Sequence, residues 1–158
     1  MRVLAIDPGY DRCGVAVLTG TGSQVTLLYS ACITTSKTDA FPTRLAAIRK
    51  EVECLFDLYK PEMLVMEKLH LKANTASAMG VAEARGVVIA QAGKTGIKVY
   101  EYSPATVKVA VAGYGRASKI QVTNMVRRLV RCPKRVMLDD EYDAIAVGLT
   151  HMASFRRE

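Results

Sequence analysis

The stretch from Arg2 to Gly20, RVLAIDPGYDRCGVAVLTG, contains the pattern that decides the fold. Residues 2–7 form an apolar run that ends in an acid, Asp7, directly before Pro-Gly, and a second apolar run covers residues 13–19. Apolar runs of this length, bounded by turn residues, are typical of buried strands. A carboxylate at the end of such a strand is either a turn residue or a ligand, and the rest of the sequence has to distinguish the two.

The elements that follow predict an α/β fold. A GTGS turn at residues 20–23 leads into a third strand at 24–33, and apolar spacing predicts a helix from about Pro42 to Tyr59. Residues 62–67, EMLVME, predict a buried strand ending at Glu67. The pattern then predicts a small-residue helix at 74–93, a strand at 97–103, a short helix at 104–111, a helix from about Ser118 to Arg131 and a last helix within 139–155. Three strands followed by alternating helices and strands predict a five-stranded mixed sheet flanked by helices.

Composition limits the class of protein. With 158 residues, half of them hydrophobic, we expect one domain over residues 1–158 with a substantial core. The four cysteines show neither a Cys-x-x-Cys pair nor a Cys/His cluster, so a zinc site is not expected and the thiols are predicted to be reduced. No apolar run approaches the roughly 18 residues of a membrane span, and we expect a cytoplasmic protein.

Positive charge is concentrated in one third of the chain. The net charge is +7, yet residues 86–138 contain ten Lys or Arg and one acid, Glu101, while the rest of the chain carries 12 basic and 14 acidic residues. A basic helix face exposed to solvent would explain evenly spread charges. Crowding of this kind favours a surface that faces nucleic acid.

Four acids lie at the ends of predicted elements. Asp7 ends the first strand and Glu67 the fourth, while Asp140 and Asp143 lie three residues apart in the first turns of the last helix. Strands joined through a helix are normally parallel, so Asp7 and Glu67 are expected at the same sheet edge. Taken singly, each acid has a structural explanation as a turn or cap residue. Together they predict a site for Mg²⁺ or Mn²⁺, since converging carboxylates need cations to neutralise them.

Several motifs together resemble the RuvC family of Holliday-junction resolvases, in the ribonuclease-H-like superfamily. They are AIDPG with Gly14, LVMEK, KANTASAMGVAEARGV, YSPATVKVAVAGYGRASKIQV and DEYDAIAVGLTH, and the resemblance runs from Arg2 to about Ser154. It implies a homodimeric, metal-dependent endodeoxyribonuclease that nicks two strands of like polarity at a four-way DNA junction, in recombination and repair. It also implies a branch-migration helicase complex as a partner.

The resemblance assigns roles by motif. It implies that Asp7 bridges two Mg²⁺ ions, for which Mn²⁺ substitutes, and that Glu67, Asp140 and Asp143 complete their shells. Asp139, Asp140 and Glu141 all compete for the third position, and Asp140 is chosen because it keeps the family's spacing to Asp143. The candidate DNA-binding residues are His70, Lys72, Lys108, Arg116 and Lys119.

Four further features leave alternatives open. His70 stands where the family usually has an aromatic residue, and stacking on bases, a surface position and proton transfer are all compatible with a histidine. The meaning of Asp11, an acid in a loop expected to face DNA, is open. His151 is predicted to be a packed or hydrogen-bonded histidine. In the small-residue helix, a face of Ala76, Met79, Gly80, Glu83, Ala84 and Val87 suits either packing on the sheet or, as the resemblance implies, a subunit interface.

Two other functions compete with a junction nuclease. A sugar-kinase-like or actin-like phosphotransferase also has an acid before a glycine turn, but it needs two such domains and a second phosphate loop, for which this chain is too short. A non-catalytic or broader-specificity branched-DNA-binding protein would keep the basic region without needing all four acids.

Overall fold

The structure is a computed structural model that describes residues 1–22, 24–69 and 75–155. The strands are β1 (Arg2–Asp7), β2 (Arg12–Thr21), β3 (Gln24–Thr34), β4 (Met63–Glu67) and β5 (Lys98–Tyr102). The helices are α1 (Phe41–Tyr59), α2 (Thr75–Thr95), α3 (Pro104–Ala112), α4 (Lys119–Leu129) and α5 (Asp139–Ser154). Every predicted element is therefore present within the described residues, with ends that differ by a few residues from those predicted. His70 and Lys72 lie outside the described residues.

The five strands form one mixed sheet in the order β3-β2-β1-β4-β5. β1 pairs antiparallel with β2, and β2 with β3, whereas β4 is parallel to both β1 and β5. The prediction that the first and fourth strands lie side by side and parallel is confirmed. Ile6 is in register with Met66, so Asp7 and Glu67 follow at the same sheet edge.

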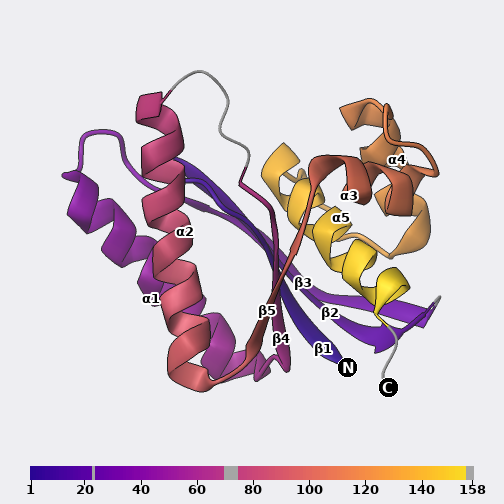
Figure 1. Ribbon diagram of the computed structural model, residues 1–158, viewed down its shortest axis with the longest axis horizontal. Helices are drawn as coiled ribbons and strands as arrows, with labels where there is room; N and C mark the ends of the chain where they lie inside the picture. Colours follow the sequence, from indigo (N-terminus) through magenta and orange to yellow (C-terminus); the bar gives the residue numbers. More distant parts are fainter. Residues whose placement is uncertain (23, 70–74, 156–158) are drawn as a thin grey trace.

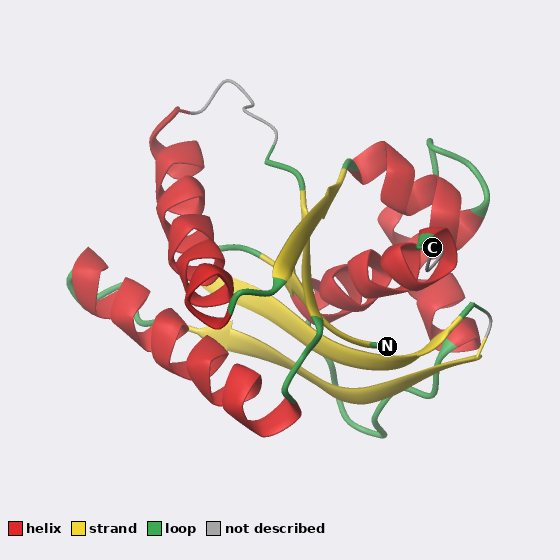
Figure 2. Ribbon diagram, turned by 60° about the horizontal axis from the view of Figure 1, so that its bottom comes forward, coloured by secondary structure: helices red, strands yellow, loops and turns green. Residues whose placement is uncertain are grey.

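Helices cover both faces of the sheet (Figures 1 and 2). α1 and α2 lie on one face, and α3, α4 and α5 lie on the other. Along β1, Val3 and Ala5 pack towards α5, while Leu4 and Ile6 pack towards α1 and α2. Burial on both faces explains why β1 reads as an unbroken apolar run.

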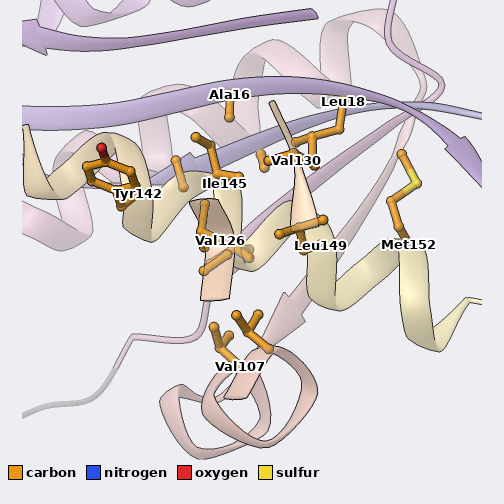
Figure 3. Packing of buried hydrophobic residues seen from close by; sticks show 14 of the residues in the cluster. Ala16, Leu18, Val107, Val126, Val130, Tyr142, Ile145, Leu149 and Met152 are labelled. Carbon is orange, nitrogen blue, oxygen red and sulfur yellow. The ribbon is translucent and has the colours of Figure 1, made fainter. Parts of the chain in front are cut away.

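α5 is the most deeply buried helix and lies directly on β1 and β2. Ile145 and Leu149 pack with Ala16 and Leu18 in the cluster drawn in Figure 3. Gly148 brings the helix close to the sheet, because a Cβ at this position would lie 2.4 Å from Leu18 Cδ1. The close contact fixes how α5 presents its first turns at the sheet edge.

Local signals set the ends of the two helices before α5. Ser118 caps α4 in a capping box, accepting from the Gln121 amide at 3.3 Å while Gln121 Oε1 accepts from the Ser118 amide at 2.8 Å. α3 begins after the cap Ser103 and ends at Gly113, whose φ of 88° favours glycine. The predicted start of α4 is thus confirmed, although the helix ends at Leu129, two residues early.

The predicted α2 face is wrong as a single surface. Gly80 and Ala84 face the interior: a Cβ on Gly80 would lie 2.7 Å from the Tyr10 ring, and Ala84 is 1% exposed. Met79 is 65% exposed and Glu83 is also exposed. The sequence grouping mixed two sides of the helix, since small residues occur on both of them.

Candidate active site

Three of the predicted acids line one cleft at the edge of the sheet. The strand alternation that directs Ala5 and Val65 towards α5 also directs Asp7 and Glu67 to that face. Asp143 joins them from the second turn of α5. The cleft has a volume of about 280 Å³ and is lined by Asp7, Glu67, Pro104, Val107, Lys108, Lys119, Val122, Asp143 and Ala146.

Asp7 lies where burial and neighbouring charges oppose its ionisation. Burial, followed by the negative charges of Asp143, Glu67 and Asp140, raises the pKa of Asp7 from 3.8 to about 7. The charge of Lys119 acts in the opposite direction and lowers this pKa. A carboxyl group whose ionisation is opposed by three neighbouring acids is suited to a cation.

Asp140 reaches the site from above Gly14, the residue paired with Asp7 across β1 and β2. A Cβ on Gly14 would lie 1.9 Å from the backbone oxygen of Asp140. The Oδ2 atom of Asp140 is buried and accepts no hydrogen bond from the residues that the structure describes, although Arg12 Nε lies 3.2 Å away in an ion pair. A buried carboxylate oxygen without a hydrogen-bond donor is a group that a bound cation would satisfy.

The neighbours of Asp140 on α5 are engaged elsewhere. Asp139 has a 69% exposed side chain and lies 3.5 Å from Lys119 Nζ. Glu141 is 2% exposed and binds Arg135 and Ser30. Burial alone would raise the pKa of Glu141, but these hydrogen bonds hold it below its usual value. Of the three acids that compete for the third position, Asp140 is the one beside Asp7.

Lys119 links α4 to the acids of α5. Its Nζ lies 2.9 Å from Asp143 Oδ2. Burial opposes its charge, yet the hydrogen bond and charge of Asp143, with those of Asp139, raise the pKa of Lys119. Burial also raises the pKa of Asp143, although Lys119 opposes the change. Lys108 lines the same cleft, whereas Arg116 is exposed in the loop that joins α3 to α4.

No ready-made metal cage exists among residues 1–22, 24–69 and 75–155. Within these ranges, no three His, Cys, Asp or Glu side chains are grouped so that they could hold a metal ion as they stand. The negative charges of the other acids raise the pKa of Asp7. The cleft that Asp7, Glu67 and Asp143 line is open.

Two arginines at the site were not recognised in the sequence. Arg12, at the start of β2, pairs with Asp140. Arg85, on α2, is 8% exposed, donates from Nη1 to the Glu67 carbonyl at 2.8 Å and pairs with Glu101. Arg12 connects β2 to α5, and Arg85 connects α2 to the strands before and after it, and no local motif marks such contacts.

The structure also answers two questions that the sequence raised. Asp11 accepts from Arg44 and lies 3.6 Å from Lys37, so it fixes its own loop, and the hydrogen bond from Arg44 lowers its pKa. His151 is fully buried, with Nδ1 2.8 Å from the Tyr102 hydroxyl, and burial lowers its pKa. The prediction of a packed, hydrogen-bonded His151 is confirmed.

In the part of the chain that the structure describes, no helix is both long and apolar enough to cross a membrane.

The fold and the acidic edge of the sheet define the class of the protein as a ribonuclease-H-like nuclease. The family model for the crossover junction endodeoxyribonuclease RuvC matches residues 3–151. The protein of that name from Petrotoga mobilis is 41% identical over 157 residues, covering 99% of this chain and 96% of the relative. The one from Brevibacillus brevis is 39% identical over 156 residues, covering 99% and 93%. The chain therefore belongs to the RuvC family of Holliday-junction resolvases.

Solved structures agree with this assignment. Thermus thermophilus RuvC in complex with a Holliday junction substrate has a TM-score of 0.89 and 32% identity, covering 96% of this chain and 92% of the other. The yeast mitochondrial Holliday junction resolvase Ydc2, at 15% identity, has a TM-score of 0.71 over 96% of this chain and 78% of its own. This second likeness shows the shared fold alone. Membership of a RuvC-type nuclease family implies dependence on a metal ion.

Proposed function

We propose that the protein resolves four-way DNA junctions by nicking two strands of like polarity at symmetric positions. The observation that carries the proposal is the convergence of Glu67, Asp140 and Asp143 on Asp7. Burial, together with the negative charges of these three acids, raises the pKa of the Asp7 carboxyl to about 7. The Thermus relative, solved with a Holliday junction substrate, supports the choice of DNA. Recombination and repair are the processes that require this reaction.

The chemistry of the four acids suits a divalent cation, although their side chains are not grouped around one point as they stand. They supply hard oxygen ligands, of which the buried Oδ2 of Asp140 accepts no hydrogen bond. Asp7, Glu67, Asp140 and Asp143 would hold two Mg²⁺ ions, with Asp7 as the acid common to both, and we expect Mn²⁺ to substitute. Bound ions of this kind supply a hydroxide nucleophile and stabilise the leaving oxygen of a phosphodiester.

Basic residues around the cleft have a separate task. Lys119 and Lys108 line the cleft from two helices that lie on the same face of the sheet, and they are suited to neutralising a phosphate at the acids. Arg116, exposed in the loop between these helices, is suited to a neighbouring phosphate. His70 and Lys72, which follow β4 in the sequence, remain candidates for DNA contact. Electrostatic contacts of this type bind the DNA backbone, and the junction's shape supplies selectivity.

Paired nicks require two active sites, and we infer a homodimer. The outer side of α2 carries exposed Met79 and Ile89, which are 65% and 37% exposed. Between them, a Cβ on Gly86 would meet no atom within 4 Å, so a second helix could approach closely there. A two-fold axis at this helix would give each strand its own site. A branch-migration helicase complex is the further partner that we expect.

A strand-resolved cleavage assay tests the proposal. A synthetic four-way junction is labelled on each strand in turn and incubated with the protein and Mg²⁺, with Mn²⁺, or with a chelator. We expect paired nicks with either metal and none with the chelator. Binding without cleavage under all conditions would instead identify a non-catalytic branched-DNA-binding protein, and cleavage of flaps or forks at equal rates would identify a broader nuclease.

A further inference from the structure

The start of α5 has an unusual anchor. The residue at its N-cap, Leu138, has no side-chain group that could accept a hydrogen bond from the first turn. Glu141 takes over part of this role, since its Oε1 accepts from the Leu138 amide at 3.2 Å. The helix that carries Asp140 and Asp143 is therefore held at its start by the acid that lies between them.

Glu141 is fully satisfied by three partners. Arg135 donates from Nη1 to Oε1 at 3.0 Å and from Nη2 to Oε2 at 2.7 Å, and the Ser30 hydroxyl donates to Oε2 at 3.0 Å. With the Leu138 amide, Glu141 accepts four hydrogen bonds while it is 2% exposed. Bidentate arginine pairs of this type fix orientation as well as distance.

The same cluster extends to the sheet. Arg135 Nη2 also donates to the Ser30 carbonyl at 2.8 Å, and Ser30 on β3 is paired with Ala16 on β2. Two residues along β2 from Ala16 is Gly14, against which the backbone of Asp140 packs. The contact between α5 and the sheet at the candidate metal site is thus supported on its outer side by this cluster.

Helix geometry connects the cluster to the acids. Successive side chains on an α-helix are rotated by about 100°, so fixing the direction of Glu141 fixes the directions of Asp140 and Asp143. A buried or half-buried ion pair adds little net stability, because desolvation offsets the attraction. Because 45% of the Arg135 side chain is exposed, the ion pair between Arg135 and Glu141 adds little to stability. Its contribution here is to orient Glu141.

We propose that the Arg135–Glu141–Ser30 cluster is a positioning element that turns Asp140 and Asp143 towards Asp7 and so sets the affinity of the site for its metal. The inference rests on the proposed function, because the metal site is itself part of that proposal. Arg135, counted above among the basic residues that suggested DNA binding, has this structural role instead.

Mn²⁺ binding without DNA tests the inference. Bound Mn²⁺ is measured by electron paramagnetic resonance for the wild type, Arg135→Ala, Arg135→Lys and Ser30→Ala. The control is Arg49→Ala, at an exposed position of α1. Loss of partners that orient metal ligands typically weakens binding 10- to 100-fold, and we expect at least about tenfold for Arg135→Ala. Arg135→Lys, which keeps the positive charge but has a single donor nitrogen in place of the bidentate guanidinium, and Ser30→Ala should lose less in the same direction. Arg49→Ala should bind as the wild type does.

A second readout separates orientation from stability. In the cleavage assay, the Mg²⁺ concentration for half-maximal rate should rise for Arg135→Ala while the rate at saturating Mg²⁺ recovers. A role in stability alone would lower the melting temperature and leave that concentration unchanged, which would overturn the inference. Should Arg135→Ala fail to fold, wild-type Mn²⁺ affinity in both Arg135→Lys and Ser30→Ala would overturn it equally. A wild type that binds no Mn²⁺ would instead refute the proposed metal site.

Discussion

Gly14 and Asp140 are in such close contact that no side chain fits between them. A Cβ on Gly14 would lie 1.9 Å from the Asp140 backbone oxygen and 2.5 Å from its carbonyl carbon. Because Gly14 is also the residue paired with Asp7, the gap in the side-chain layer lets the first turn of α5 reach the acid of β1. Gly14 is thus as important for the geometry of the site as the acids are, because it allows α5 to approach Asp7.

Substituting this glycine should disturb the site through α5. Gly14→Ala is expected to lower the free energy of unfolding by about 1–3 kcal/mol, because backbone has to move to relieve the clash. Mn²⁺ binding should weaken as well, since Asp140 moves with the helix. Thermal unfolding and Mn²⁺ titration measure the two effects. The control is Gly93→Ala, where a Cβ meets nothing within 4 Å; equal behaviour of the two variants would contradict the prediction.

The charge of Asp7 should destabilise the metal-free protein at neutral and higher pH. Its pKa is raised to about 7 in the fold, so the stability that the neutral carboxyl provides is full below about pH 4 and is lost as the pH rises through 7. Asp7→Asn should therefore raise the free energy of unfolding by about 1–3 kcal/mol at about pH 8 and leave it nearly unchanged at about pH 4. Urea denaturation in a chelator measures this difference.

Saturating Mg²⁺ should reverse that order near pH 8. The wild type gains stability from the bound ions, whereas the variant lacks a ligand. An Asp7→Asn variant that is less stable than the wild type in the chelator at pH 8 would show that the acids do not oppose one another as described.

Lys119 should act on cleavage more than on binding. Lys119→Met removes the cation that lies 2.9 Å from Asp143, and we expect the cleavage rate to fall about 100-fold with a smaller loss of junction affinity. The pH at half-maximal rate should also rise, since Lys119 is the residue that lowers the pKa of Asp7. Lys98→Ala, at the opposite end of β5, is the matched control. A wild-type cleavage rate in Lys119→Met would remove Lys119 from the site.

The proposed dimer depends on the outer side of α2. Gly86→Glu should leave the fold of one chain intact, because a Cβ there meets no atom within 4 Å and glutamate favours a helix more than glycine does. In a dimer through this side, two facing glutamates would repel each other. Sedimentation at micromolar concentration should show a monomer for the variant and a dimer for the wild type. A wild-type monomer, or a dimeric variant with paired nicks, would exclude this interface.

The strands and their acids could be predicted because their signals are local. Turn residues bound each apolar run. Two hairpins followed by the helical connection from β3 to β4 make β4 parallel to β1, so Asp7 and Glu67 were expected at one edge. The N-cap of α4 could also be predicted from the sequence, because Ser118 and Gln121 lie in one turn.

Contacts between distant residues could not be predicted in the same way. Ser30 and Glu141 are 111 residues apart, and Arg85 binds Glu67 from another element. An arginine in a basic segment is interpreted as a DNA contact when its acidic partner is unknown. Arg135, whose partner is Glu141, is an example. The two sides of α2 were confused for a related reason, since alanine and glycine fit both a packed face and an open one.

The most direct test of the central claim is cleavage of a four-way junction by the wild type and by Asp7→Asn in saturating Mg²⁺, with each strand labelled and junction binding measured in parallel. The account predicts paired nicks on two strands of like polarity by the wild type, and undiminished binding without nicks by Asp7→Asn. Cleavage by Asp7→Asn at the wild-type rate would contradict it.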